Sequence, residues 1–163
     1  MEIDGERYQK TLGWSSVLLT DFRKFKYLDR KNVVIAGARR DRKWVAPPHN
    51  AFKLNTYATI NSHLNRASVG GLLRDCQGRL LLAFGKQITQ PLSVVHGELL
   101  AIKEGVKLLY EMGFINVHIE SDSLLAVQAV TTNQKNLGYV GDCAQEITSL
   151  LKEPIIAGIS HIN

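Results

Sequence analysis

The sequence predicts an α/β domain built around a mixed β-sheet. Three strand-like stretches joined by short turns lie within residues 53–85, and a long amphipathic helix pattern follows at 91–113. Another strand pattern comes directly after that helix, at 115–119. A strand that follows a helix implies a crossover connection and a parallel partner. Antiparallel strands followed by parallel ones make a mixed sheet.

The three early strands are predicted to form an antiparallel meander. Residues 53–60 (Lys-Leu-Asn-Thr-Tyr-Ala-Thr-Ile) are strand-like, a polar loop follows, and the second strand begins near Val69. The turn at 75–78 ends in a glycine, which can take a positive φ, and the third strand follows at once at 79–85. Short turns of this kind join antiparallel neighbours.

The longest periodic segment indicates a helix within 91–113. Its apolar residues recur at steps of three and four along one face: Val95, Leu99, Ile102, Val106 and Leu109. Ser93 is a candidate N-cap, and Gly113 is a candidate for the residue that ends the helix. Glu98 lies beside the apolar stripe, where a carboxylate without a partner is expensive to bury.

The rest of the chain predicts two short helices, at 122–131 and 144–151, and a last strand at 154–161. The element order is therefore βββαβααβ, and the helices can cover both faces of the sheet. Asp122 follows the 115–119 strand directly. It can belong to a helix cap, formed by Ser121 or by Asp122 itself. It can also be a metal ligand at the carboxyl edge of the sheet, where α/β proteins collect ligands.

Several stretches occur in the order found in one known family. They are Lys53–Asn55, Gly70–Asp75 and Gly78, preceded by Trp44 and Pro47–Pro48 and followed by Gly97–Ala101, Glu120–Ser123 and Ile159–Ile162. The chain from about Trp44 to Asn163 resembles the plant ribonuclease H-like domain of the reverse-transcriptase-derived type. The resemblance implies a ribonuclease H-like fold, with a five-stranded mixed sheet, the first strand central and helices on both faces. It also implies endonucleolytic cleavage of the RNA strand of RNA–DNA hybrids with two magnesium ions (Mg2+).

The resemblance further implies four metal-binding groups, and two of them match. Glu98 matches the helix carboxylate, and Asp122 matches the carboxylate after the fourth strand. Where the family has Asp on the first strand, the chain has Tyr57, a phenol that titrates near pH 10 and is neutral at pH 7. Asn55 shares a strand face with Tyr57 and is a candidate for weak cation binding or nucleic-acid contact. The fourth group belongs to a final helix, which we expect to be missing because the resemblance ends at Asn163.

Positive charge is concentrated before the predicted domain. The net charge is +5, yet residues 51–163 contain 9 Lys and Arg and 9 Asp and Glu, whereas 1–50 contain 11 against 6. The densest part contains Arg39, Arg40, Arg42 and Lys43. It is either a solvated linker or an arm that attracts phosphates. We therefore expect a basic extension at 1–43 and the ribonuclease H-like domain at 44–163, with an RNA–DNA hybrid as partner.

Composition excludes a membrane-spanning helix, because no run of about 18 apolar residues occurs. The N-terminus lacks the basic-then-apolar order of a secretory signal. The 2 cysteines and 5 histidines show no metal-binding spacing. These features predict an intracellular protein of the nucleus or cytoplasm, with free thiols.

Three functions remain open at this point. The chain is an active ribonuclease H that uses Glu98 and Asp122, a nucleic-acid-binding module of the same fold with a disabled site, or a degenerate fragment without activity. Tyr57 in place of the strand carboxylate favours the second and third, with cleavage impaired. The basic arm favours the binding module over the fragment. The oligomeric state and the nucleic-acid preference stay open.

Overall fold

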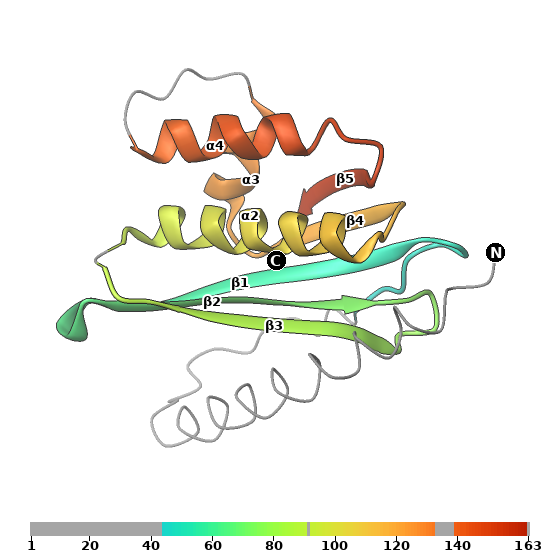
Figure 1. The fold of residues 1–163 in the computed structure, drawn as a ribbon, viewed down its shortest axis with the longest axis horizontal. Helices are drawn as coiled ribbons and strands as arrows, with labels where there is room; N and C mark the ends of the chain where they lie inside the picture. Colours follow the sequence, from blue (N-terminus) through green and yellow to red (C-terminus); the bar gives the residue numbers. More distant parts are fainter. Residues whose placement is uncertain (1–43, 91, 133–138, 163) are drawn as a thin grey trace.

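The central strand of the protein is β1, Phe52–Asn61, which lies in the middle of a five-stranded sheet of order β3-β2-β1-β4-β5. The computed structural model describes residues 44–90, 92–132 and 139–162. β1 pairs antiparallel with β2 and parallel with β4, while β2–β3 is antiparallel and β4–β5 is parallel. The predicted mixed sheet with the first strand central is therefore confirmed (Figure 1).

The other elements follow the predicted order. The strands are β2 Arg66–Arg74, β3 Leu80–Ile88, β4 Val117–Ser121 and β5 Ile156–His161, the helices are α2 Val94–Met112, α3 Leu124–Thr131 and α4 Tyr139–Leu150, and η1 is a single 3-10 turn at Ser62–Leu64. β4 begins two residues later than predicted because Asn116 takes a left-handed backbone conformation, with φ 58°. α4 begins before residue 144 because Val140 also packs against the core.

The predicted turn between β2 and β3 is confirmed. Gly78 has φ 79°, and its nitrogen donates to the carbonyl oxygen of Asp75 at 3.0 Å. The Asp75 carboxylate accepts hydrogen bonds from the backbone nitrogens of Gln77 and Arg79, both at 2.9 Å. The side chain of Asp75 thus accepts hydrogen bonds from backbone N–H groups of a turn whose conformation Gly78 permits.

The caps and the apolar face of α2 are also as predicted. Ser93 is the N-cap and accepts a hydrogen bond from the nitrogen of His96, and Gly113 ends the helix with φ 71°. Four residues of the predicted stripe are at most 1% exposed: Leu99, Ile102, Val106 and Leu109. They pack onto β1 through Leu54, which is 1% exposed. Burial of this stripe holds α2 on the sheet.

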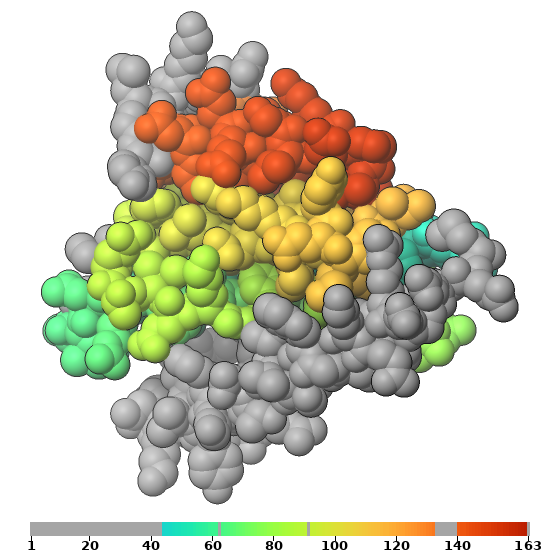
Figure 2. Space-filling view, in the orientation of Figure 1, coloured from blue at the N-terminus to red at the C-terminus, as the bar shows by residue number. Residues whose placement is uncertain are grey.

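The three described helices lie on one face of the sheet (Figure 1). α2 lies across β1 and β2, α4 contacts α2, and α3 contacts α4 and β5. Figure 2 shows the surfaces of α2 and α4 adjoining on this side. The sequence predicted helices on both faces of the sheet. Within residues 44–90, 92–132 and 139–162, no helix lies on the opposite face. None of these three helices has the length and hydrophobicity needed to cross a membrane.

Candidate active site and the adjoining polar cluster

Tyr57 and Asp122 lie just past the end of the parallel ladder that joins β1 and β4. The ladder ends at the pair Thr56–Ser121; the next residue along the chain is Tyr57, still within β1, in one case and Asp122, directly after β4, in the other. Asp122 is exposed, whereas Tyr57 is half-buried. The two residues therefore lie on neighbouring elements, because β1 and β4 are paired in the sheet.

Glu98 reaches the same region from the first turns of α2. The helix approaches β1 closely at Gly97, where an added Cβ would lie 2.8 Å from Ile60 Cδ1 and 3.2 Å from Ala58 Cβ. Glu98 is the next residue and is only 5% exposed. Its Oε1 accepts a hydrogen bond from the backbone nitrogen of Ala58 at 3.0 Å. The glycine therefore lets the carboxylate reach the backbone of the central strand.

The second carboxylate oxygen of Glu98 is not satisfied in this way. Oε2 is buried and has no hydrogen-bond partner among the described residues. The pKa of Glu98 is raised to about 7, chiefly by burial and also by the negative charge of Asp122, while the hydrogen bond from Ala58 acts in the opposite direction. A buried carboxylate in this state gains from a proton or from a cation.

Asp122 is not the cap of α3. The N-cap is Ser123, whose Oγ accepts a hydrogen bond from the nitrogen of Ala126 at 3.2 Å. The nitrogen of Ser123 in turn donates to Ser121 Oγ at 3.2 Å. The interpretation of Ser121 or Asp122 as the cap is therefore wrong. The Asp122 carboxylate lies at the surface, between two serines that fix its backbone.

Tyr57 faces the side of the sheet opposite to α2. Side chains alternate along a strand, and Ala58 meets α2 at Gly97, so Tyr57 and Asn55 face the other way. The phenol lies over Gly70, its partner on β2, where an added Cβ would be 2.9 Å from the hydroxyl oxygen. Burial raises the pKa of Tyr57 to about 12. The phenol is therefore neutral at pH 7 and brings no charge to this position.

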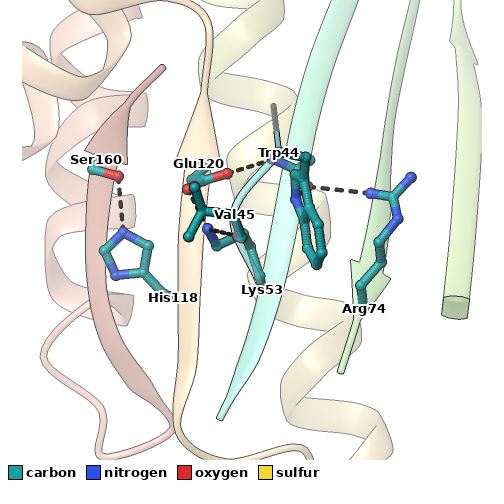
Figure 3. Close-up of polar contacts among 8 residues, drawn as sticks. Trp44, Val45, Lys53, Arg74, His118, Glu120 and Ser160 are labelled. Atoms are coloured by element: carbon teal, nitrogen blue, oxygen red, sulfur yellow. Dashed lines mark hydrogen bonds and ion pairs between the residues drawn. The ribbon is translucent and has the colours of Figure 1, made fainter. Parts of the chain in front are cut away.

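A polar cluster lies on the same face as Tyr57 and consists of Trp44, Lys53, Asn55, Arg74 and Glu120 (Figure 3). Lys53 Nζ and Glu120 Oε1 form an ion pair at 2.7 Å, and Asn55 Nδ2 donates to Glu120 Oε2 at 2.8 Å. Asn55 Oδ1 accepts from Trp44 Nε1 and from Arg74 Nη1, both at 3.3 Å. The amide oxygen considered above as a weak cation ligand is thus occupied by two donors of the protein.

Sequence reasoning identified Asn55 but missed the other four members of the cluster, three of which hydrogen-bond to it. Side chains alternate between the two faces of β1, so Lys53 and Asn55 lie on the same face, and this signal was available in the sequence. The pairings with Arg74 and Glu120 depend on strand register, which sequence alone left open. The predicted phosphate-attracting residues fall outside the described part of the chain: Arg39, Arg40, Arg42 and Lys43.

Two carboxylates converge at the site, and their donor set fits one divalent cation. Within residues 44–90, 92–132 and 139–162, no group of three or more His, Cys, Asp or Glu side chains could hold a metal ion. Glu98 and Asp122 offer the carboxylate oxygens that hard divalent cations prefer. Tyr57 does not add a third charge, so the residues do not fit a pair of ions.

A protein-family model described as reverse transcriptase-like matches residues 55–163. The chain belongs to this family. The match includes Tyr57, Glu98 and Asp122, so the three positions compared above all lie within the matched region. Comparison with curated proteins gave no match.

Solved ribonuclease H1 structures are similar to this chain. Ribonuclease H1 from the halophilic archaeon Halobacterium salinarum NRC-1 has a TM-score of 0.62 at 17% identity, covering 69% of this chain and 85% of that chain. LC11-RNase H1, isolated from compost by a metagenomic approach, has a TM-score of 0.61 at 18% identity, covering 69% and 84%. LC11-RNase H1 in complex with an RNA/DNA hybrid has a TM-score of 0.59 at 17% identity, covering 68% and 84%. These similarities show a ribonuclease H-like fold.

Proposed function

We propose that this protein is a ribonuclease H-like nucleic-acid-binding domain that takes RNA–DNA hybrids and cleaves them poorly. The family match and the shared fold support hybrid binding, since one structural neighbour was solved with an RNA/DNA hybrid. The impaired cleavage rests on one observation. On β1, one residue past the end of its ladder with β4, the chain has Tyr57, a neutral phenol turned over Gly70.

Magnesium is the proposed cation, held by Glu98 and Asp122. The buried and unpartnered Oε2 of Glu98 supports this assignment, because a cation would neutralise the charge that burial disfavours. Two-metal hydrolysis uses a pair of ions that clamp the attacking and the leaving oxygen. Glu98 and Asp122 bring two negative charges against four positive ones for such a pair. One ion is therefore bound, weakly, and the pair is not assembled.

Hybrid recognition is expected to rest on backbone shape and 2′-hydroxyl contacts, so sequence preference is weak. The basic residues 39, 40, 42 and 43 are proposed to add electrostatic attraction to phosphates. Attraction of this kind weakens steeply as salt rises. Substituting these four residues with glutamine should flatten the dependence of affinity on salt.

The test combines binding and cleavage on the full chain. Fluorescence anisotropy with a labelled hybrid, a DNA duplex and an RNA duplex, in EDTA and in magnesium, measures affinity. Gel electrophoresis of the same hybrid measures cleavage. We expect the hybrid to bind in EDTA, with preference over DNA, and to remain uncut. Equal, weak binding of all three duplexes at every salt concentration would reject hybrid binding.

Residual cleavage with a single ion is the second candidate function. It is favoured by Glu98, whose pKa of about 7 and buried position are typical of carboxylates that act at catalytic sites. Glu98→Gln distinguishes the two candidates, because it abolishes residual cleavage and leaves hybrid binding in EDTA unchanged.

A further inference from the structure

Trp44 is a partly exposed aromatic side chain that is fixed on the sheet. The residue is 40% exposed, and its Nε1 donates to Asn55 Oδ1 at 3.3 Å. The indole also closes against the β2–β3 turn, where a Cβ on Gly78 would lie 3.3 Å from Cζ3. An indole held in this way presents a large contact area with little loss of conformational entropy on binding.

Two cations accompany the ring, one from each of two paired strands. Lys53 Nζ lies 5.5 Å from the centroid of the Trp44 ring, and Arg74 Cζ lies 5.6 Å from it. Lys53 and Arg74 are direct partners in the β1–β2 ladder, so the register of the sheet places both beside the indole. Figure 3 shows them on either side of Trp44 in that view.

The two cations differ in how their charge is balanced. Lys53 is buried, donates to the carbonyl oxygen of Val45 at 2.6 Å and pairs with Glu120 at 2.7 Å. Arg74 is only half-buried and contacts two neutral groups, the Asn55 amide and the indole. No carboxylate of the described residues forms an ion pair with it. Arg74 therefore leaves a positive charge next to the exposed part of the ring.

We propose that Trp44 and Arg74 form a binding site for an unpaired base of a single-stranded nucleic acid. The base stacks on the part of the indole that Lys53 and Arg74 leave exposed, and the Arg74 guanidinium attracts the adjoining phosphate. An aromatic surface beside unbalanced positive charge is the combination by which single strands are bound without sequence preference. Neither Glu98 nor a metal ion takes part.

The position of this site along β1 suits a strand that extends beyond a hybrid. Lys53 and Tyr57 share one face of β1 and are four residues apart, which corresponds to about 13 Å. A single strand leaving the region of Tyr57 and following β1 would meet the indole. The inference extends the proposed hybrid binding to the unpaired segment that flanks it, but it can be tested with single strands alone.

The decisive experiment uses the full chain with Trp14→Phe, because the chain has 2 tryptophans and Trp44 is then the only one. Its fluorescence is titrated, in EDTA, with short oligothymidylate, with oligouridylate and with an abasic DNA oligomer of equal length. Stacking predicts quenching by the two oligomers that carry bases and none by the abasic oligomer. The DNA and RNA oligomers show which sugar is preferred. Equal affinity for the base-carrying and abasic oligomers, or no quenching by any of them, would overturn the proposal.

Substitutions test the same site through affinity. Removing a stacking aromatic is expected to weaken single-strand binding roughly 5- to 150-fold, so Trp44→Leu should do so and Trp44→Phe should retain most of the affinity. Arg74→Gln should reduce the slope of log affinity against log salt by about one. Lys107→Gln, on α2 at the opposite face, is the control and should leave affinity unchanged. Unchanged affinity in a folded Trp44→Leu protein would contradict the proposal.

Two readouts keep the outcomes separate. Circular dichroism shows whether Trp44→Leu folds, and if it does not, the fluorescence titration of the intact indole decides the question. Binding of a blunt-ended hybrid is measured on the same proteins. Trp44→Leu should bind the blunt hybrid as the parent does and lose affinity for single strands. A loss of hybrid binding in every protein, with quenching by single strands intact, would reject the proposed function and leave the stacking site standing.

Discussion

The Glu98 carboxylate accepts a hydrogen bond from the backbone nitrogen of Ala58 at 3.0 Å, one residue beyond Tyr57. This contact ties the start of α2 to the carboxyl half of β1 and holds the carboxylate on the helix side of the strand. Tyr57 faces the opposite side. Asp122 adds a second negative charge that raises the pKa of Glu98, and the neutral phenol does not contribute a third. The region therefore has half of the charge that a pair of divalent ions carries.

Folding stability should fall as pH rises through the range in which Glu98 titrates. The pKa of this carboxyl is raised from 4.5 to about 7 in the folded protein. Between these values the folded state keeps a proton that the unfolded state has lost. The free energy of unfolding therefore decreases as pH rises from about 4.5 to 7, by up to about 3 kcal/mol. Urea unfolding in EDTA at pH 5 and pH 8 measures the difference.

Glu98→Gln is the control for this pH dependence. The amide keeps an oxygen that accepts from Ala58 and cannot ionise. The variant should lose much less stability between pH 5 and pH 8 and should be more stable than the parent at pH 8. If parent and variant lose the same free energy over this interval, the titration of Glu98 is not the cause.

Gly70→Ala should destabilise the fold, and Gly85→Ala should not. The two glycines are partners across β2 and β3. A Cβ at Gly70 would lie 2.8 Å from the carbonyl oxygen of Phe84 and 2.9 Å from the Tyr57 hydroxyl, whereas one at Gly85 meets nothing within 4 Å. Overpacking of this kind costs about 1–3 kcal/mol. Denaturant unfolding of both variants provides the comparison, and equal effects would show that the phenol does not occupy this space.

The ion pair between Lys53 and Glu120 should be strongly coupled. The two residues are 7% and 9% exposed, so removing one leaves a buried charge that has lost its counter-ion. Glu120→Ala should cost about 3–5 kcal/mol. The double variant Lys53→Met, Glu120→Leu should recover most of this loss, because apolar residues of similar volume replace a buried pair at little cost. Additive losses in a double-mutant cycle would contradict this coupling.

The fold could be predicted from sequence because its signals are local. The apolar spacing of α2, the capping by Ser93 and the glycines at 78 and 113 each determine the conformation of a few neighbouring residues. The start of β4 was less accurate, since Ile115 fits an alternating pattern but is 53% exposed before the left-handed residue Asn116. Patterns of polarity do not report such a local change of direction.

The site was predictable only in part, for a different reason. Glu98 and Asp122 were placed at the site because each lies in a sequence motif of the family. Tyr57 was placed there because it occupies the position of the family's first-strand Asp. The contacts of Asn55 with Arg74 and Glu120 join residues 19 and 65 positions apart, so they depend on the pairing of three strands. The orientation of the Tyr57 phenol depends equally on the absence of a side chain at Gly70.

Tyr57→Asp should increase magnesium affinity. The substitution places a carboxylate on β1 just past the end of its ladder with β4, on the strand beside Asp122, and an additional negative ligand is expected to strengthen binding on the order of tenfold. In Tyr57→Asn the new side chain has nearly the same shape as that of Asp but carries no charge, so this variant serves as the matched control. Thermal unfolding over a magnesium titration measures apparent affinity. Equal midpoints for the Asp and Asn variants would show that this position lies outside the reach of the ion.

Cleavage of a labelled RNA–DNA hybrid in magnesium, by the unmodified chain and by Glu98→Gln, tests the central claim most directly. The loss of one preorganised electrostatic contact costs on the order of 10²–10³ in rate, and the loss of a metal ion should cost more. We expect the unmodified chain to bind the hybrid and to cut it no faster than the Glu98→Gln protein does. Brisk magnesium-dependent cleavage that Glu98→Gln abolishes would contradict the account and show that two carboxylates suffice beside Tyr57.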